Sequence, residues 1–137
     1  YQTDAYFSFS DIPDTASCFV DALRRATERA GFAAPDSPQA VYEVFANSLA
    51  RLTVRDLQTV EQALGYTFDT VYIVGGGSQA AAVNRRIAVQ SGKRVRTGCT
   101  EAAAVGNLLW QMLACGALGS PAQALEVSRR SFPMIEF

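Results

Sequence analysis

The sequence predicts an α/β fold in which parallel strands are packed against helices. Two short segments read as strands, at residues 70–74 and 94–97, and a helix-forming segment follows each of them. Strands that alternate with helices pair in parallel, because each helix carries the chain back to the same end of the sheet. Two more helices are predicted ahead of the first strand. Since two strands alone make a poor sheet, we expect further strands to come from sequence upstream of this chain.

The first half of the chain predicts two helices. Asp11 can cap the first, which has apolar residues at helical spacing and stops at Gly31. Ser37 and Pro38 start a long second helix, which Gly65 ends. Its buried face is predicted from apolar residues three and four apart, which are Val41, Phe45, Leu49, Leu52, Val60 and Leu64. Charged residues are expected on the solvent face: Arg51, Arg55, Asp56 and Glu61.

The second half predicts a strand, a glycine loop and three helices. Residues 70–74 are β-branched and apolar without alternation, which is typical of a strand buried on both faces. After the glycines come a helix of small residues that ends at Gly92, a short strand at 94–97, and a helix that Thr100 can cap. Ser120 and the proline after it open a last helix to about residue 130. The inner face of the middle helix is predicted to contain Val105, Leu108, Leu109, Met112 and Leu113.

Composition narrows the class of protein. A length of 137 residues with 49% hydrophobic residues suits one compact domain with a full core. Lys and Arg number 12 against 13 for Asp and Glu, a balance that argues against a nucleic-acid binder. Charges interrupt every apolar run, and no leader peptide is recognisable, so we expect a cytoplasmic protein without a membrane partner. The missing initiator Met suggests a piece of something longer.

The chain has no His and three cysteines, which are Cys18, Cys99 and Cys115. No two of them form a C-x-x-C pair, so neither a zinc site nor a disulfide framework is predicted. We expect all three to be buried thiols in a reducing cytosol. No metal site is predicted in this chain.

Three glycines that directly follow a strand and precede a helix are the strongest chemical signal. Gly75, Gly76 and Gly77 let the backbone pass close to a ligand, and the helix that follows aims free amides at the same point. Ser78 adds a hydroxyl and can cap that helix. This arrangement favours the binding of phosphate or another anion. The alternative is a tight turn in which the glycines only permit close packing of strand and helix.

Two common nucleotide-binding motifs fit this loop poorly. A P-loop needs a Lys after the glycines, and none is present. Gly75, Gly77 and Ala80 match the dinucleotide-binding spacing, but no carboxylate ends the second strand to hold a ribose. Arg94 or Arg96 in that strand could meet a 2′-phosphate instead. A fragment of an NAD(P)-dependent oxidoreductase therefore stays open as an alternative.

A second signal lies at the start of the next helix. Thr100 is followed by Glu101, an acid at the positive end of the helix dipole. Gly106 lies inside the same helix, where glycine costs about 1 kcal/mol relative to Ala. Close packing of the helix on a sheet is the favoured explanation for Gly106.

These motifs resemble the C-terminal domain of the FGGY carbohydrate kinases, and among them the rhamnulokinase group. The resemblance rests on the run from Val71 to Gln79, on Asn84, on Glu101 with the alanine after it, and on Gly106 with the asparagine after it. It is firm from about residue 71 to 110 and looser over 11–64. Residues 122–132 also resemble that family.

The resemblance implies that the chain is part of an actin-like, ribonuclease H-like ATPase domain, with residues 1–137 forming a partial C-terminal nucleotide-binding domain. ATP with Mg²⁺ would lie against the glycine loop, where Gly76 matches the middle glycine of the family. The implied ATP-binding residues are Gly75, Gly76, Gly77 and Ser78, followed by Gln79, Ala80 and Glu101. The implied substrate is a ketose, L-rhamnulose above all, or another ketose or polyol. The family's catalytic aspartate would lie in an N-terminal domain outside this chain, which alone is expected to be inactive.

The sequence departs from the family pattern near the loop. Ala80 stands where the family usually has Asn, which puts one polar contact to ATP in doubt. Cys99 and Thr100 replace the usual Pro-Val ahead of Glu101. A non-catalytic nucleotide-binding domain is therefore a further alternative.

Overall fold

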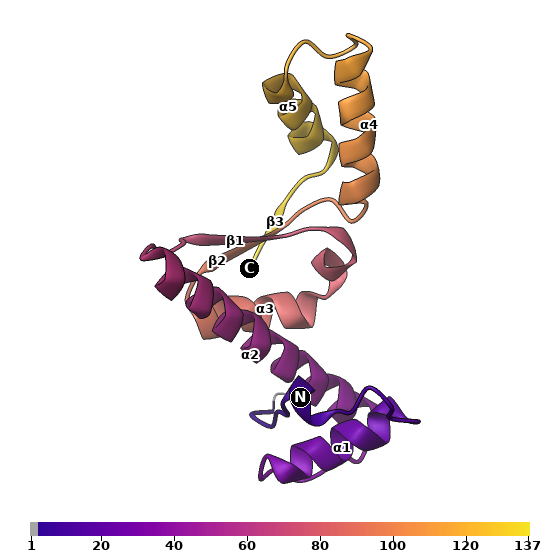
Figure 1. Cartoon of the computed structure of the whole chain (residues 1–137), viewed down its shortest axis with the longest axis vertical. Coiled ribbons are helices and arrows are strands. Elements are labelled where there is room, and N and C mark those ends of the chain that lie inside the picture. The colour runs from indigo at the N-terminus through magenta and orange to yellow at the C-terminus, as the bar shows by residue number, and fades with distance from the viewer. Residues whose placement is uncertain (1–2) are drawn as a thin grey trace. The chain divides into compact units, whose positions relative to one another are not determined.

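The structure is a computed structural model that describes residues 3–137 (Figure 1). It forms two compact units where the length predicts one. Unit 1 comprises the described residues up to Thr67 together with Val89–Ser91, and unit 2 comprises Phe68–Ala88 and Gly92–Phe137. The elements in order are η1 (Phe9–Asp11), α1 (Phe19–Arg29), α2 (Pro38–Leu64), β1 (Thr70–Ile73), η2 (Gly75–Gln79), α3 (Ala81–Ser91), β2 (Arg94–Thr97), α4 (Ala102–Ala114), α5 (Pro121–Ser131) and β3 (Ile135–Glu136), where η marks a 3-10 helix.

Unit 1 has a hydrophobic core between α1, α2 and the segment that leads into η1. Phe7, Leu23, Ala26 and Val44 form its centre and are at most 3% exposed. Ser48 ties the leading segment to α2, because its Oγ donates to the carbonyl of Val44 at 2.7 Å and accepts from the amide of Phe7 at 3.0 Å. The aromatic ring of Phe7 in turn lies beside that of the residue that opens η1.

The predicted start of the first helix is wrong. Asp11 ends the 3-10 helix η1, and its backbone carbonyl accepts from Nη2 of Arg29 at 2.7 Å. The α-helix begins only at Phe19, after an extended Cys18 that makes no side-chain cap. Of residues 12–18, only Ile12 packs against the core, so this region offers no apolar face that a helix would bury, and the chain crosses it as turns.

The bounds of α2 are confirmed at both ends. Ser37 Oγ accepts from the amide of Ala40 at 3.2 Å, and Gly65 adopts a left-handed φ of 63°. The buried face is rotated from the predicted one, since the buried residues are Ala40, Glu43, Val44, Ala46, Asn47, Ser48, Ala50 and Val54. Val60 and Leu64 are 48% and 63% exposed, because no described segment covers the last turns of the helix.

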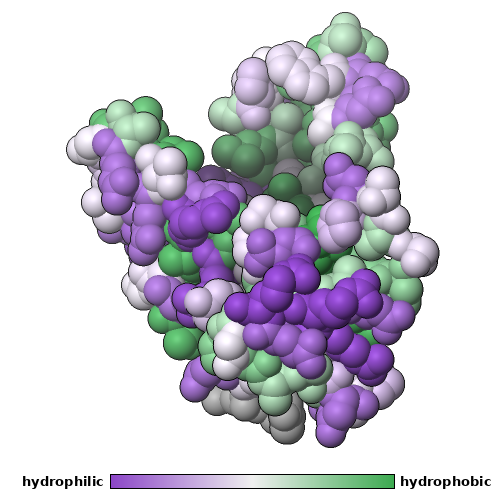
Figure 2. All heavy atoms as spheres, turned by 60° about the horizontal axis from the view of Figure 1, so that its bottom comes forward, coloured by the Kyte–Doolittle hydropathy of each residue, from purple (hydrophilic) through white to green (hydrophobic). Residues whose placement is uncertain are grey.

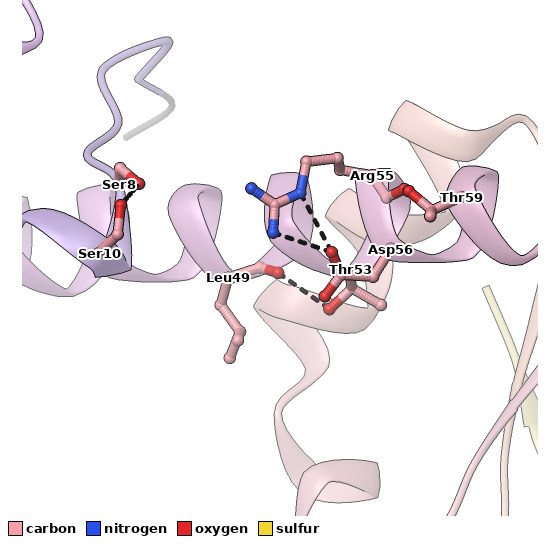
Figure 3. Close-up of polar contacts among 7 residues, drawn as sticks. All are labelled: Ser8, Ser10, Leu49, Thr53, Arg55, Asp56 and Thr59. Atoms are coloured by element: carbon pink, nitrogen blue, oxygen red, sulfur yellow. Dashed lines mark hydrogen bonds and ion pairs between the residues drawn. The ribbon is translucent and has the colours of Figure 1, made fainter.

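The predicted solvent face of α2 is confirmed for Arg51, Arg55 and Asp56, which are exposed. Figure 3 shows Arg55 turned toward its neighbour, and both its Nε and its Nη2 donate to Asp56 Oδ1, at 3.1 and 2.9 Å. Hydrophilic residues are also crowded on the surface that comes forward in Figure 2. Charged side chains on one side and a core on the other are what an amphipathic helix requires.

Unit 2 is organised around a three-stranded sheet in the order β1-β2-β3. β1 pairs with β2 in parallel, with Thr70 opposite Arg94 and Ile73 opposite Thr97, as the alternation of strands and helices predicts. The third strand was not predicted. It is two residues long and antiparallel to β2, and a segment that short has no periodicity to detect.

Burial of β1 on both faces is contradicted. Tyr72 is 60% exposed, and Val74, directly after the strand, is 57% exposed. An apolar run without alternation predicts two covered faces, but no described segment covers one face of β1.

α4 and α5 lie side by side in unit 2 (Figure 1). The start of α5 is confirmed, since Ser120 Oγ accepts from the amide of Gln123 at 3.2 Å. Thr100 does not cap α4, because the N-cap position is Glu101, which makes no side-chain cap. The predicted inner face of α4 is only partly covered: Val105, Leu109, Met112 and Leu113 are half-buried, whereas Leu108 is 56% exposed.

The expectation of buried thiols is wrong for this structure. Cys18 and Cys115 are exposed, and Cys99 is half-buried, with all three free. No helix among residues 3–137 combines the length and the apolar composition needed to cross a membrane.

Candidate functional site

The glycine loop is wound into the 3-10 helix η2, directly after β1. Gly75 has a φ of 73°, a left-handed conformation that glycine adopts without strain. Its amide donates to the carbonyl of Cys99 at 2.9 Å, and the amide of Gly98 donates to the carbonyl of Ile73 at 2.9 Å. These two bonds join the segments that leave β1 and β2. The loop therefore lies at the carboxyl ends of the parallel strands, which is where α/β sheets hold ligands.

Asn84 braces the loop from α3. Its side chain is 1% exposed, and its Nδ2 donates to the carbonyls of Gly77 and Ser78, at 3.3 and 3.1 Å. Ser78 is itself buried, and its Oγ donates to the carbonyl of Gly75 at 2.7 Å. One buried amide thus fixes two consecutive loop carbonyls. This contact was not predicted, because in the sequence Asn84 is one of several polar residues of α3 and contributes only to the family resemblance.

The predicted cap by Ser78 is wrong. α3 begins at Ala81, and its N-cap residue is Ala80, which has no side chain to cap with. The hydroxyl of Ser78 is turned back into the loop instead, toward Gly75. No side chain therefore caps the first turn of α3, whose leading amides have no partner within a helix.

The three glycines differ in whether the protein itself requires them. Gly75 needs its positive φ. At Gly76 an added Cβ would meet no atom within 4 Å, and at Gly77 it would make only an ordinary contact of 3.6 Å with Ile73. Neither of these two has a positive φ. By contrast, an added Cβ at Gly98 would lie 3.3 Å from the side chain of Val74, so packing restricts that site. Backbone geometry and packing therefore explain Gly75 and Gly98, but not Gly76 or Gly77.

The remaining predicted site residues surround this turn. Gln79 is exposed and ends η2, and Ala80 is half-buried between η2 and α3. Glu101 is exposed at the N-cap of α4. The residue before it approaches the loop, because the carbonyl oxygen of Thr100 would lie 4.0 Å from a Cβ on Gly75. The structure thus brings the segment that leads into Glu101 next to the start of the loop.

Close packing does not explain Gly106, contrary to expectation. An added Cβ there would meet nothing within 4 Å, and its φ is not positive. The residues described around α4 leave this position open.

One of the two arginines of β2 is held in an ion pair, whereas the other, Arg94, is exposed. Arg96 Nε donates to Glu136 Oε2 at 2.6 Å across β2 and β3. This hydrogen bond to Glu136, followed by one to Tyr72, holds the pKa of Arg96 above its usual value. The ion pair makes Arg96 a poor candidate for binding a 2′-phosphate. Among residues 3–137, no group of three or more His, Cys, Asp or Glu side chains could hold a metal ion.

A pocket of about 730 Å³ lies in unit 1. It runs between the leading segment and α2, and Arg51 stacks over the ring of Tyr6 there, 4.0 Å from its centroid. None of the predicted site residues lines it. Its arginines already contact the chain itself, Arg51 through Tyr6 and Arg55 through Asp56.

No family model matches the chain. Several curated relatives are named rhamnulokinase. The one from Oceanobacillus iheyensis is 31% identical over 118 residues, which is 86% of this chain and 25% of that protein. The relative from Bacillus subtilis is 35% identical over 86 residues, 63% of the chain and 17% of the protein. The relative from Lactiplantibacillus plantarum is 34% identical over 79 residues, 58% of the chain and 16% of the protein.

The chain therefore spans a quarter or less of the length of these relatives, and it matches their C-terminal part. The resemblance that the sequence motifs predict is confirmed at the level of the rhamnulokinases. By sequence, this chain is a rhamnulokinase-like segment that corresponds to the C-terminal part of such sugar kinases.

Proposed function

We propose that the chain supplies part of the ATP site of a sugar kinase, and that the complete polypeptide phosphorylates a ketose, with L-rhamnulose as the first candidate. The nucleotide would lie at residues 75–78, with Gln79, Ala80 and Glu101 at the margins. ATP would supply the phosphoryl group, and Mg²⁺ bound to it would offset its charge. The chain's own part is to hold the phosphates with backbone amides at the carboxyl end of the sheet.

The observation that supports the proposal is the pair of glycines that the fold does not require. Glycine destabilises an ordered segment by about 0.5–1 kcal/mol relative to Ala, because it loses more backbone freedom on folding. Gly76 and Gly77 have ordinary φ values and room for a side chain. A ligand that approaches the backbone there would explain both residues, whereas a tight turn explains only Gly75.

The two alternatives receive less support. A fragment of an NAD(P)-dependent oxidoreductase would need a ribose or 2′-phosphate contact at the end of β2, where Arg96 is paired with Glu136. A nucleotide-binding domain without catalysis is favoured by Ala80 and by the absence of a suitably placed base among the described residues. The relatives' name, rhamnulokinase, favours the kinase over both.

The test is Gly76→Val in the complete kinase. We expect the KM for ATP to rise about tenfold or more, equivalent to at least about 1.4 kcal/mol, because the new side chain would occupy the place of the nucleotide. The fold should survive, since nothing lies within 4 Å of the added Cβ. Gly119→Val is the matched control: it also adds a side chain at an exposed glycine without positive φ, but outside the loop. An unchanged KM for ATP in a folded Gly76→Val protein would exclude the proposed site.

The isolated chain is expected to have no kinase activity. A general base must reach the sugar hydroxyl within hydrogen-bond distance, and we propose that this base lies in the preceding part of the polypeptide. Glu101 is a carboxylate near the loop, since it directly follows Thr100, whose carbonyl oxygen approaches Gly75. The measurement is ADP release from Mg-ATP with L-rhamnulose, using the isolated chain. Turnover that Glu101→Gln abolishes would contradict this division of the site.

A further inference from the structure

α4 combines an uncharged sequence with an exposed surface. Its thirteen residues, Ala102–Ala114, include no Asp, Glu, Lys or Arg. Apart from Asn107 and Gln111, which share a hydrogen bond of 3.2 Å on one exposed side, its residues are apolar, and a helix surface that is largely apolar belongs in a protein interior. None of its residues is buried, however, and Leu108 and Trp110 are 56% and 70% exposed. Composition and exposure therefore disagree along this helix.

α5 alone cannot resolve the disagreement. It lies beside α4 (Figure 1), but one neighbouring helix covers one side. Leu108 and Trp110 are two positions apart and so point in directions roughly 200° apart around the helix axis. At least one further element is needed to bury both of them. The open position at Gly106 lies on the same helix and has room for a neighbour.

Other parts of unit 2 lack cover as well. Tyr72 and Val74 expose apolar surface at and just after β1, and Ile135 does so on β3. β1 is also the edge of the sheet, with β2 on one side only, so one row of its backbone groups has no strand partner. Figure 2 shows apolar residues reaching the surface at the top of the view, where α4 and α5 lie. An unpaired strand edge next to uncovered apolar faces calls for further strands and helices.

The geometry points to one kind of segment that covers these exposed apolar surfaces. We propose that α4 is an interior helix of the complete kinase, covered on the Leu108 and Trp110 sides by the polypeptide that precedes this chain. The matched relatives contain at least three quarters of their length outside the matched region, and the match lies in their C-terminal part. A membrane is a poor occupant, because thirteen helical residues span roughly 20 Å against a hydrocarbon core of about 30 Å. This inference rests on the proposed function only in taking the longer polypeptide to be a kinase.

The experiment compares one substitution in two settings. Leu108→Glu is introduced into the 137-residue chain and into the complete kinase, and the thermal midpoint of each is measured without nucleotide. In the isolated chain the midpoint should not change, because the side chain is already in water. In the complete kinase it should fall by several degrees, because the carboxylate would be buried without a partner. Trp110→Ala tests the opposite side of α4 in the same way.

Gln62→Glu is the matched control, since Gln62 is an exposed polar residue of α2 in unit 1 and should leave the midpoint unchanged in both settings. Leu108→Ala is the milder replacement if Leu108→Glu prevents the complete kinase from folding. Equal loss in both settings would overturn the proposal, because the helix would then be buried within the chain. No loss in either, or a dimer of the isolated chain that Leu108→Glu dissociates, would overturn it too. Because no nucleotide is present, this result is independent of ATP binding at residues 75–78.

Discussion

The two compact units differ in how they bury apolar side chains. In unit 1, α1 and α2 enclose Leu23, Ala26 and Val44, which are 0–3% exposed. In unit 2, α4 has no buried residue, and β1 has one uncovered face. Each unit nevertheless contains a helix with the expected side-chain cap, which is Ser37 on α2 in unit 1 and Ser120 on α5 in unit 2.

This difference separates what local sequence controls from what it does not. A cap and a terminating glycine act over four or five residues, so they work in either unit. Burial depends on segments far apart in the sequence. Unit 1 contains the segments that form its core, whereas unit 2 has apolar side chains that no segment within residues 3–137 covers. The curated relatives, which are at least four times as long as the matched region, are consistent with that division.

The largest expected effect is a core deletion in unit 1. Leu23→Ala should lower the free energy of unfolding by about 2–5 kcal/mol, because Leu23 is fully buried and the cavity could not collapse entirely. Leu108→Ala in unit 2 should change it by less than about 0.5 kcal/mol in the isolated chain. Urea unfolding followed by circular dichroism measures both. Amide exchange then assigns each loss to a unit, and equal losses would contradict the contrast between the units.

The next largest effect is expected from breaking the buried hydrogen bonds that hold the glycine loop. Asn84→Ala should cost about 1–3 kcal/mol of stability, because the carbonyls of Gly77 and Ser78 would lose their donor. The KM for ATP of the complete kinase should rise with it if the loop holds the nucleotide. Asn107→Ala is the control, since Asn107 is exposed and accepts only from Gln111. A stable protein with a disordered loop would instead show that Asn84 shapes the loop without stabilising the unit.

The sequence predicted the elements better than their surroundings. The ends of α2, the glycine that ends α3 and the start of α5 all follow from local signals, and the structure confirms them. The start of α1 was misplaced because Asp11, a residue type that often caps helices, lies well ahead of Phe19, where the helix begins. The predicted burial of β1 and of Leu108 on α4 was wrong, because the sequence of a single strand or helix does not show whether the segment that covers it lies in the same chain.

In the candidate site, too, the sequence predicted the position of the loop but not the contacts that hold it. Its position after β1 could be read from three glycines and a strand. The hydrogen bonds of Asn84 could not be predicted, because they join residues that are six and seven apart across an irregular turn. The predicted cap by Ser78 was wrong for a related reason, since its Oγ donates to the carbonyl of Gly75 within the turn and does not accept from an amide of α3.

A smaller effect, on the affinity for ATP, is expected at Ala80, where the sequence departs from the family pattern. Ala80→Asn should tighten ATP binding to the complete kinase by about 1 kcal/mol, the typical net contribution of one hydrogen bond. Ala80 is half-buried next to the loop, whereas Ala81 is exposed on the first turn of α3. Ala81→Asn is therefore the control and should leave the affinity unchanged. Titration calorimetry measures both, and looser binding by Ala80→Asn would contradict the position given to this residue.

The smallest effect compares an ion pair in each unit. Arg55 and Asp56 are adjacent on α2 with exposed side chains, so Asp56→Asn should change stability by less than about 0.5 kcal/mol and leave amide exchange in unit 1 as it was. Arg96 and Glu136 instead join β2 to β3, a strand of only two residues. Glu136→Gln should therefore speed exchange of the Phe137 amide, which donates to the carbonyl of Val95 at 2.9 Å. Because salt screens exposed pairs, high salt should reproduce part of that change in the unmodified chain and none in Glu136→Gln. Unchanged exchange at Phe137 would show that backbone bonds alone hold β3, and that the two ion pairs are equally dispensable.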